Sequence, residues 1–476
     1  MRIDGGLYRL VYEYYEARIL HGYYKCGEAL PSIHHICKLF HMAPSTVRSA
    51  LVLLEKSGYI QMDGRKNACV AYFATPEQYI ENAARYFAPR MDGILDLSSS
   101  GPLLLEPLWK AGLMQWSDED WEILRLGITE PGENDVAMPV EFFLLVLSAL
   151  NNKLILNFYW EVIRYVRFPY LNNREEMPRM ARTVAGWSRE AGIAHLKKQF
   201  DMSYEKTVAC LLTFVTSVRE RGDAAGLEPI SFTWNIYRRR PQLRYSLVSV
   251  LIREIVSGVY PPGSYLPSLP NMVQKYGVAL NTVRRTLLIL EGLGLSRSYH
   301  GKGTQVCTES EAIDFSQKDI QQGFDMYVES LRLFSLTAVP VLTYTLEHVE
   351  SGGRALLLGN ITDMCRNKKG CDCYDVLLGF VAEHCPLALV RECYGRLKDL
   401  LVWGYPFMLS RVAGEDLHER YRPVLERSET CLKQGDVHGF ANLWKMMLEK
   451  EEAWAGAYMK DMDALRLAGN RKTPRR

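Results

Sequence analysis

Two Thr-Val-Arg triplets carry the side chains of this sequence that are best suited to binding a polyanion. Thr46-Val47-Arg48 and Thr282-Val283-Arg284 lie 236 residues apart. Threonine hydroxyls and arginine guanidinium groups donate hydrogen bonds to phosphate oxygens and to guanine edges. Farther along the chain, Arg65-Lys66 and His300-Gly301-Lys302 keep cationic side chains on short loops, where a glycine lets the backbone approach a partner closely. These residues predict contact with nucleic acid.

Cysteine spacing argues against a metal centre. Cys365, Cys371 and Cys373 are separated by five residues and by one residue, and these spacings fit no common zinc site, although Asp372 and Asp375 lie nearby. The eleven cysteines are scattered, odd in number and without a Cys-x-x-Cys pair, which is typical of small buried side chains in a reducing cytoplasm. We expect no disulfide, no metal and no cofactor.

Two other clusters have both a functional and a structural interpretation. A group of tyrosines near the N-terminus could stack on bases, but its helical spacing favours packing against a core or a partner. Arg164 and Arg391 could bind a small carboxylate ligand through a bidentate fork, beside Trp160 and Trp403. The ordinary alternative is a solvated arginine and a packed tryptophan. The tyrosines are Tyr8, Tyr12, Tyr14, Tyr15, Tyr23 and Tyr24.

Length and composition indicate several folded domains. The chain has 476 residues, of which 48% are apolar and 24% are charged. At ~100 to 200 residues per domain, this length suggests three or four domains. No run of ~18 apolar residues suits a membrane span. Arg2, Asp4, Arg9 and Glu13 interrupt the N-terminus where a signal peptide would be apolar, so we expect a cytoplasmic protein without membrane contact.

Positive charge is concentrated in two segments. Residues 1–75 hold nine Lys and Arg against six Asp and Glu, a net charge of +3, and residues 237–306 hold ten against two, a net charge of +8. Because the whole chain carries +2, the remainder carries −9. Two basic segments on an acidic background are expected if those segments contact a polyanion and the rest does not.

The two basic segments contain an internal repeat. Residues 7–70 align with residues 243–306 without a gap, and 18 of the 64 positions are identical. The identities fall at turns and at helical positions; Leu30-Pro31-Ser32, for example, matches Leu266-Pro267-Ser268. A repeat of this length predicts two domains of the same fold.

Each copy predicts three helices and a hairpin. In the second copy, apolar residues at helical spacing precede Gly258, which would end the first helix, and Ser268 would cap a second helix that ends near Gly277. A third helix would open at Ala279 or Asn281 and close at Gly292 or Gly294. A short helix, a turn and a second helix with polar side chains outward are typical of a helix-turn-helix.

The spacing within the third helix predicts which side chains it exposes. Val283, Leu287 and Leu290 would face inward. Thr282, Arg284 and Arg285 would therefore face outward. Two short strands would flank His300-Gly301-Lys302-Gly303 and form a wing.

Both copies resemble the winged helix-turn-helix of the GntR family of bacterial transcription regulators. The family shows Gly-x3-4-Gly-x2-Leu-Pro-Ser, then Thr-Val-Arg-x2-Leu-x2-Leu-Glu-x2-Gly, then a Gly-Lys-Gly-Thr wing, and the second copy has all three parts between Gly258 and Thr304. The resemblance implies that the third helix enters the major groove of double-stranded DNA and that the wing tip reaches the minor groove and backbone. We expect DNA contacts from Ser45, Thr46, Arg48, Ser49, Arg65 and Lys66 in the first copy, and from Ser268, Asn281, Thr282, Arg284, Arg285, His300, Gly301 and Lys302 in the second.

The copies also depart from the family pattern. Ala43-Pro44 and Ala279-Leu280 stand where the family usually has Ser-Arg, so a base-reading arginine is missing from both. Arg65-Lys66-Asn67-Ala68 stands where the second wing has Gly301-Lys302-Gly303-Thr304. The first copy would then bind more weakly, or read a different half-site.

Long segments with helical spacing follow each winged helix. They resemble the all-helical effector domain of the FadR-type branch of the family, which binds a small acid, often over a metal held by histidines, and dimerises. Phe142-Phe143 and Asp375-Val376 stand where that branch has Phe-His. A metal site of that type would lack its ligands, so we expect none.

The fold that the sequence predicts is mainly α, a tandem repeat of a winged helix-turn-helix and an all-helical bundle. We place the winged helices at 1–75 and 237–307 and the helical effector or dimerisation domains at 76–236 and 308–476. The predicted function is sequence-specific transcription regulation by a single-chain pseudo-dimer that reads two half-sites, modulated by a small-molecule effector or a partner, with further homodimerisation as an option. The alternative is a protein-interaction scaffold with degenerate winged helices. An enzyme is disfavoured because neither helical segment alternates strands with helices or places a nucleophile beside a base.

Overall fold

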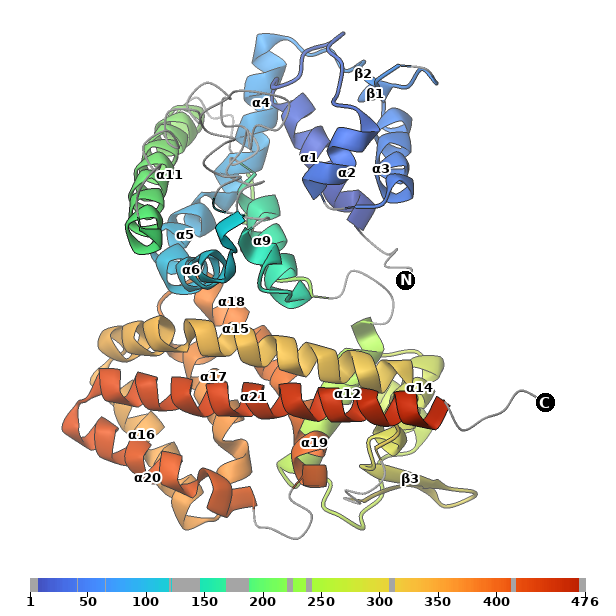
Figure 1. Cartoon of the computed structure of the whole chain (residues 1–476), viewed down its shortest axis with the longest axis vertical. Coiled ribbons are helices and arrows are strands. Elements are labelled where there is room, and N and C mark those ends of the chain that lie inside the picture. The colour runs from blue at the N-terminus through green and yellow to red at the C-terminus, as the bar shows by residue number, and fades with distance from the viewer. Residues whose placement is uncertain are drawn as a thin grey trace. The chain divides into compact units, whose positions relative to one another are not determined.

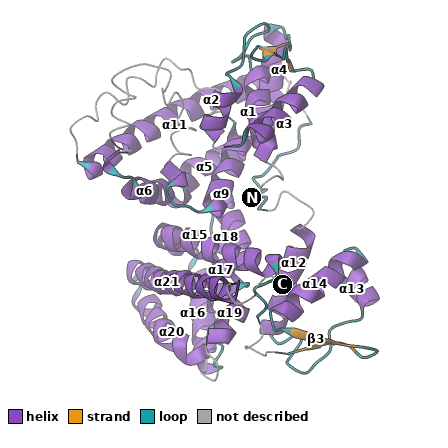
Figure 2. Cartoon of the chain, turned by 45° about the vertical axis from the view of Figure 1, so that its right-hand side comes forward, coloured by secondary structure: helices purple, strands orange, loops and turns teal. Residues whose placement is uncertain are grey.

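The computed structural model describes residues 7–40, 42–64, 66–119, 121, 146–167, 188–220, 226–236, 242–307, 313–411 and 417–470. The chain divides into two compact units, Met1–Arg239 and Arg240–Arg476. Helices dominate both, and the strands of the described residues form two small hairpins (Figure 2). The mainly α fold is confirmed. Phe142-Phe143 lies outside the described residues.

The first winged helix packs three helices against a two-stranded wing. Val47, Leu51 and Leu54 of its third helix are buried and face the core. Tyr14 and Tyr15 are also buried, which confirms packing rather than base stacking for these two rings. The elements are α1 (Leu7–Leu20), α2 (Ile33–Phe40), α3 (Pro44–Lys56), β1 (Ile60–Gln61) and β2 (Cys69–Val70).

The second winged helix repeats this arrangement. The segment before its second helix pairs with the wing through the same three backbone hydrogen bonds as in the first copy. Gly263 N–H donates to Val306 O at 2.8 Å, as Gly27 does to Val70 O, and Leu266 N–H donates to Thr304 O at 2.9 Å. The elements are α12 (Gln242–Val256), α13 (Leu269–Tyr276), α14 (Leu280–Gly292), β3 (Ser296–Tyr299) and β4 (Gly303–Val306).

Glycines end the helices where the sequence predicts stops, but one predicted cap is wrong. Gly258, Gly277 and Gly294 have positive φ (79°, 63° and 71°), a conformation that glycine adopts without a steric penalty. Ser268 precedes α13 but its side chain makes no capping hydrogen bond. Pro270 occupies the second helical position and has no N–H, which removes one of the two donors that a capping hydroxyl can use.

Helices from distant parts of the sequence build the body of the first unit (Figure 1). A capping box at Thr75 and Gln78 starts α4 directly after the wing. Phe158 and Trp234 are buried against each other, with ring centroids 4.9 Å apart. The helices are α4 (Pro76–Phe87), η1 (Ala88–Arg90), α5 (Met91–Leu104), α6 (Glu106–Gln115), α9 (Lys153–Val166) and α11 (Arg189–Glu220).

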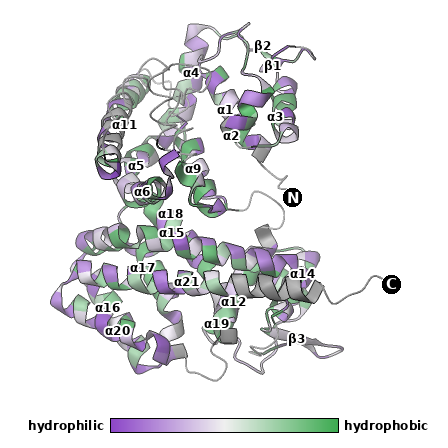
Figure 3. Ribbon diagram, viewed as in Figure 1, coloured by the Kyte–Doolittle hydropathy of each residue, from purple (hydrophilic) through white to green (hydrophobic). Residues whose placement is uncertain are grey.

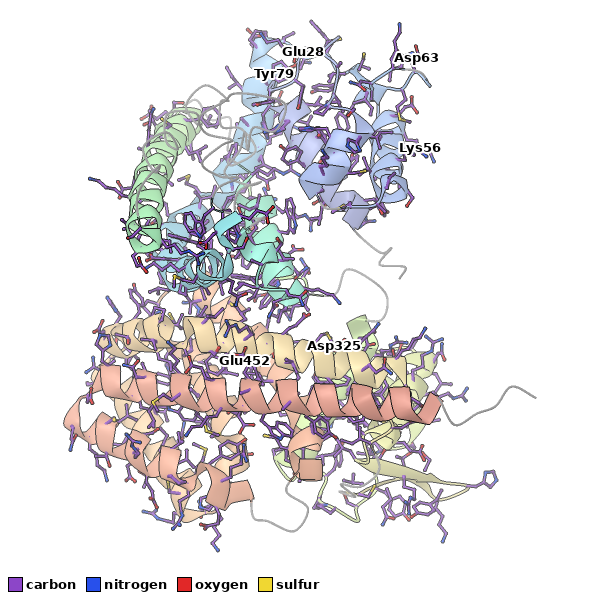
Figure 4. All side chains as sticks on the ribbon, in the orientation of Figure 1. Glu28, Lys56, Asp63, Tyr79, Asp325 and Glu452 are labelled. Carbon is purple, nitrogen blue, oxygen red and sulfur yellow. The ribbon has the colours of Figure 1, made fainter. Side chains whose placement is uncertain are left out.

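Two long helices, α15 (Lys318–His348) and α21 (Val437–Asn470), form the centre of the second unit. They run side by side, and both carry hydrophobic as well as hydrophilic residues where Figure 3 colours them (Figures 1 and 3). Glu452 of the last helix, labelled in Figure 4, pairs with Arg332 of the first at 3.3 Å. The helices are α15 (Lys318–His348), α16 (Ser351–Arg366), η3 (Gly370–Asp372), α17 (Cys373–His384), α18 (Ala388–Leu401), α19 (Gly404–Arg411), α20 (Leu417–Gln434) and α21 (Val437–Asn470).

Substitution of Gly323 should loosen the contact between bundle and winged helix in the second unit. A Cβ on Gly323 would lie 2.1 Å from the ring of Trp403, whose Nε1 donates to Ser249 of α12 at 2.9 Å. Gly323→Ala should therefore lower the stability to urea by about 1 to 3 kcal/mol through overpacking. Gly359→Ala, on the exposed face of α16 with open space around it, should instead stabilise by roughly 0.5 to 1 kcal/mol. Equal effects of the two substitutions would contradict this packing.

His21 should make the stability of the protein pH-dependent. Its ring packs against Phe87, and burial together with the charge of Arg167 lowers the pKa of His21 from 6.5 to about 4. Between these values the unfolded chain binds more protons than the folded one, so stability should fall as the pH falls from 6.5 to about 4. His21→Phe keeps the ring contact and should make the unfolding midpoint less dependent on pH between 6.5 and about 4. A midpoint with an unchanged pH dependence would rule out the buried neutral imidazole.

Candidate nucleic-acid interface

The third helix of the second copy presents a basic outer face. Val283, Leu287 and Leu290 are buried, and Arg284 and Arg285 are exposed, as predicted. Asn281 is also exposed, whereas Thr282 is half-buried. No hydrogen bond or ion pair joins Arg284 or Arg285 to any residue that the structure describes. Both guanidinium groups therefore keep their donors free for an external acceptor.

The third helix of the first copy exposes a smaller polar set. Ser45, Arg48 and Ser49 are exposed, and Ser49 Oγ donates to Ser45 O at 3.0 Å. Thr46, one of the residues expected to contact DNA, is only 6% exposed, so its side chain lies off the outer face of the helix. The buried stripe of α3 contains Ala50 in addition to Leu51 and Leu54. The stripe is therefore wide enough to cover Thr46.

The wings differ as the sequence indicates. Tyr299 pairs with Gly303 across the second hairpin, and the tip residues His300, Gly301 and Lys302 are exposed. Gly301 has a φ of 73°, so the sharp turn requires glycine. The first hairpin pairs two residues on each strand; its Lys66 is exposed, and Arg65 lies outside the described residues. Ser268, also expected at the interface, is exposed before α13.

Apolar and basic residues that sequence reasoning missed also lie on the exposed side of the third helices. Val52 and Leu288 occupy equivalent positions and are 40% and 60% exposed. An apolar side chain next to Arg48 or Arg284 can contact a thymine methyl group. Lys56, at the end of α3, is exposed, as is Asp63 in the wing (Figure 4). The sequence signal for Val52 and Leu288 was an apolar residue four positions after the arginine of the Thr-Val-Arg triplet, at a place outside the inward-facing stripe.

The two arginines considered for ligand binding have partners within the protein. Arg164 Nε lies 2.6 Å from Glu13 Oε2, and Arg164 also pairs with Glu161 at 3.4 Å. Arg391 Nη1 donates to the carbonyls of Cys385 and Pro386 at 2.7 and 2.9 Å and so satisfies the end of α17. Their guanidinium groups position helices, and a carboxylate ligand would have to displace these contacts.

The described part of the chain offers no arrangement for a metal or a membrane. It brings no three His, Cys, Asp or Glu side chains together in a way that could hold a metal ion. Asp375, the first residue of the Asp375-Val376 pair that stands in place of Phe-His, pairs with Arg253 at 3.0 Å and with Lys398 at 3.2 Å. Within the same residues no helix combines the length and apolar character of a membrane span.

Comparison with known families matches both winged helices. The model for bacterial regulatory proteins of the gntR family matches residues 7–70 and 245–306, the two segments of the repeat. Both winged helices therefore match the GntR family in sequence. The family match supports a DNA-binding transcription regulator, with DNA as the partner of these domains. It also suggests a regulator without enzymatic activity.

Several solved structures resemble parts of this chain at a distance. A GntR-family transcriptional regulator from Pseudomonas syringae pv. tomato is 17% identical, with 48% of this chain and 91% of that chain covered and a TM-score of 0.23. E. coli McbR/YncC is 15% identical, with 46% and 98% covered and a TM-score of 0.25. Streptococcus agalactiae GntR is 15% identical, with 44% and 99% covered and a TM-score of 0.20. The family assignment rests on the two sequence matches.

Proposed function

We propose that this protein regulates transcription by reading two half-sites of one operator through its two winged helices. The observation that carries the proposal is that each copy exposes the arginine of its Thr-Val-Arg triplet, Arg48 or Arg284, on the outer face of the third helix. A third helix with this exposure suits the major groove, and a basic wing suits the adjacent backbone. Two winged helices in one chain, here called the two readers, would contact two half-sites as the two subunits of a homodimer do.

The two half-sites need not have the same sequence. Between the copies, Ser45 corresponds to Asn281, Ser49 to Arg285 and Val52 to Leu288, and all six side chains are exposed. Side chains at these places on a third helix decide which base edges are bound. The operator is therefore asymmetric, and the more basic second copy supplies the larger share of the affinity.

Modulation by a small molecule or a partner is the second part of the proposal. In each unit the first helix of the winged helix contacts the bundle, through Glu13 and Arg164 in one and through Arg253 and Asp399 in the other. An effector that binds the bundle differently in two of its conformations would shift the winged helix attached to it.

Selection of bound fragments from a random duplex pool tests the whole proposal. Enrichment of one sequence class with two elements at a fixed spacing is expected. Binding without sequence preference, even at low salt, would favour the interaction scaffold instead.

Arginine substitutions should weaken binding to the selected operator. Arg284→Ala should raise the dissociation constant by roughly 10- to 100-fold and lower its salt dependence, because a charge-assisted base or phosphate contact is lost; Arg48→Ala should act in the same direction. Arg366→Ala is the matched control, since this arginine is 73% exposed on α16 of a bundle. Gel-shift titrations at two salt concentrations measure both effects. Equal affinities for Arg284→Ala and the control would remove α14 from the interface.

Footprinting should separate the two readers. The unaltered protein should protect two segments of the operator, whereas Arg48→Ala and Arg284→Ala should each lose a different segment at a concentration that still protects the other. Separate losses are expected because each third helix contacts its own half-site. A single protected segment, weakened alike by both substitutions, would contradict the pseudo-dimer while leaving DNA binding intact.

A further inference from the structure

In the first unit the winged helix docks on its bundle through acidic residues of its own first helix. Glu13 Oε2 lies 2.6 Å from Arg164 Nε, and Glu16 Oε2 lies 3.4 Å from Arg167 Nη2. The four side chains are 13 to 35% exposed. The winged helix thus supplies two carboxylates, and the C-terminal end of α9 with the following Arg167 supplies the two guanidinium groups that meet them. The buried Glu161 of α9 also pairs with Arg164.

In the second unit the polarity of this contact is reversed. Arg253 of α12 places Nε 3.0 Å from Asp375 Oδ1 and Nη2 3.1 Å from Asp399 Oδ1. The same Nη2 donates to the carbonyl of Lys398, whose ammonium group also pairs with Asp375. Here the winged helix supplies the positive charge, and the bundle supplies two carboxylates.

The two contacts occupy corresponding places. The repeat aligns α1 with α12, so Arg253 corresponds to Ala17, the residue after Glu16. On the bundle side, α9 and α18 each have 14 residues, and Arg164 and Asp399 are the twelfth residues of these helices. The last turn of the bundle helix that contacts the winged helix therefore carries a cation in the first unit and a carboxylate in the second.

We propose that these reversed charges restrict each winged helix to its own bundle. If the two exchanged partners, Glu13 and Glu16 would face Asp375 and Asp399, and Arg253 would face Arg164 and Arg167. Like charges brought together in a partly desolvated contact repel, and this repulsion discriminates against the wrong partner. The surface of α9 thus accepts an acidic helix, and the surface formed by α17 and α18 accepts a basic one.

Aromatic packing accompanies both contacts and provides less discrimination. The rings of Phe40 and Trp160 stack with centroids 5.8 Å apart in the first unit, and those of Tyr245 and Trp403 lie 5.6 Å apart in the second. Since a tryptophan of the bundle meets an aromatic ring of the winged helix in each case, apolar burial favours docking without determining the partner.

Exchange of the two winged helices within the full chain tests the proposal. The gapless alignment allows residues 7–70 and 243–306 to be exchanged without a change in length. Amide hydrogen exchange in α9 and α18 should become about tenfold faster, because the favourable pairs are lost and repulsion replaces them. Protection within α3 and α14 themselves should remain. Four further reversals in the bundles, Arg164→Glu, Arg167→Glu, Asp375→Arg and Asp399→Arg, should restore slow exchange.

The control reverses an ion pair elsewhere. Glu81 and Arg85 of α4 form an exposed pair, and reversing both in the exchanged chain should restore nothing. Native protection in the exchanged chain, or a loss that the four reversals do not repair, would overturn the proposal. Should α3 or α14 lose protection too, the unexchanged chain decides: Arg253→Glu should speed exchange in α18, and Asp375→Arg with Asp399→Arg should reverse that effect. If Asp375→Arg with Asp399→Arg did not restore slow exchange in α18, the proposal would also be overturned.

Discussion

The period of the third helix is the constraint on which both readers depend. A helix that buries Val47, Leu51 and Leu54 in one stripe places Arg48 roughly 90° to the side of that stripe, because each residue turns the helix by about 100°. Ala50 widens the stripe on the opposite flank, so Arg48 stays exposed. The same relation buries Val283 and exposes Arg284 in the second copy. Core formation and presentation of the guanidinium group are therefore one event. No separate device is needed to hold the arginine outward.

Local signals predicted the winged helices, and the errors have local causes. Glycine stops, the Thr-Val-Arg stripe and the wing turn are set by residues near one another in sequence, so spacing alone located them. Thr46 was misplaced because a three-residue stripe of apolar positions understates the width that Ala50 adds. Ser268 makes no capping hydrogen bond, whereas the equivalent Ser32 accepts from the N–H of His35; Pro270 removes one of the two possible donors in the second copy.

Contacts between distant segments could not be predicted in this way. Arg164 appeared as an arginine on a helix, open to either a ligand or solvent, and its partner Glu13 lies in another domain. The pair Arg253 and Asp375 joins positions 122 residues apart. Charge patterning along one helix contains no information about which remote helix it meets, so the reversed polarity became visible when the packing of α1 on α9 and of α12 on α18 was known.

The contacts that hold each winged helix on its bundle are individually weak. Partly exposed ion pairs each contribute about 0.2 to 1 kcal/mol, so the charges at Arg164 and Arg253 add little affinity and act mainly by penalising the wrong partner. The stacked Phe40 and Trp160 and the buried Trp403 supply most of the adhesion. An effector with a coupling free energy of about 1 to 3 kcal/mol would match such a contact in size. Contacts of this size separate at modest cost, and the reversed charges would return each winged helix to its own bundle.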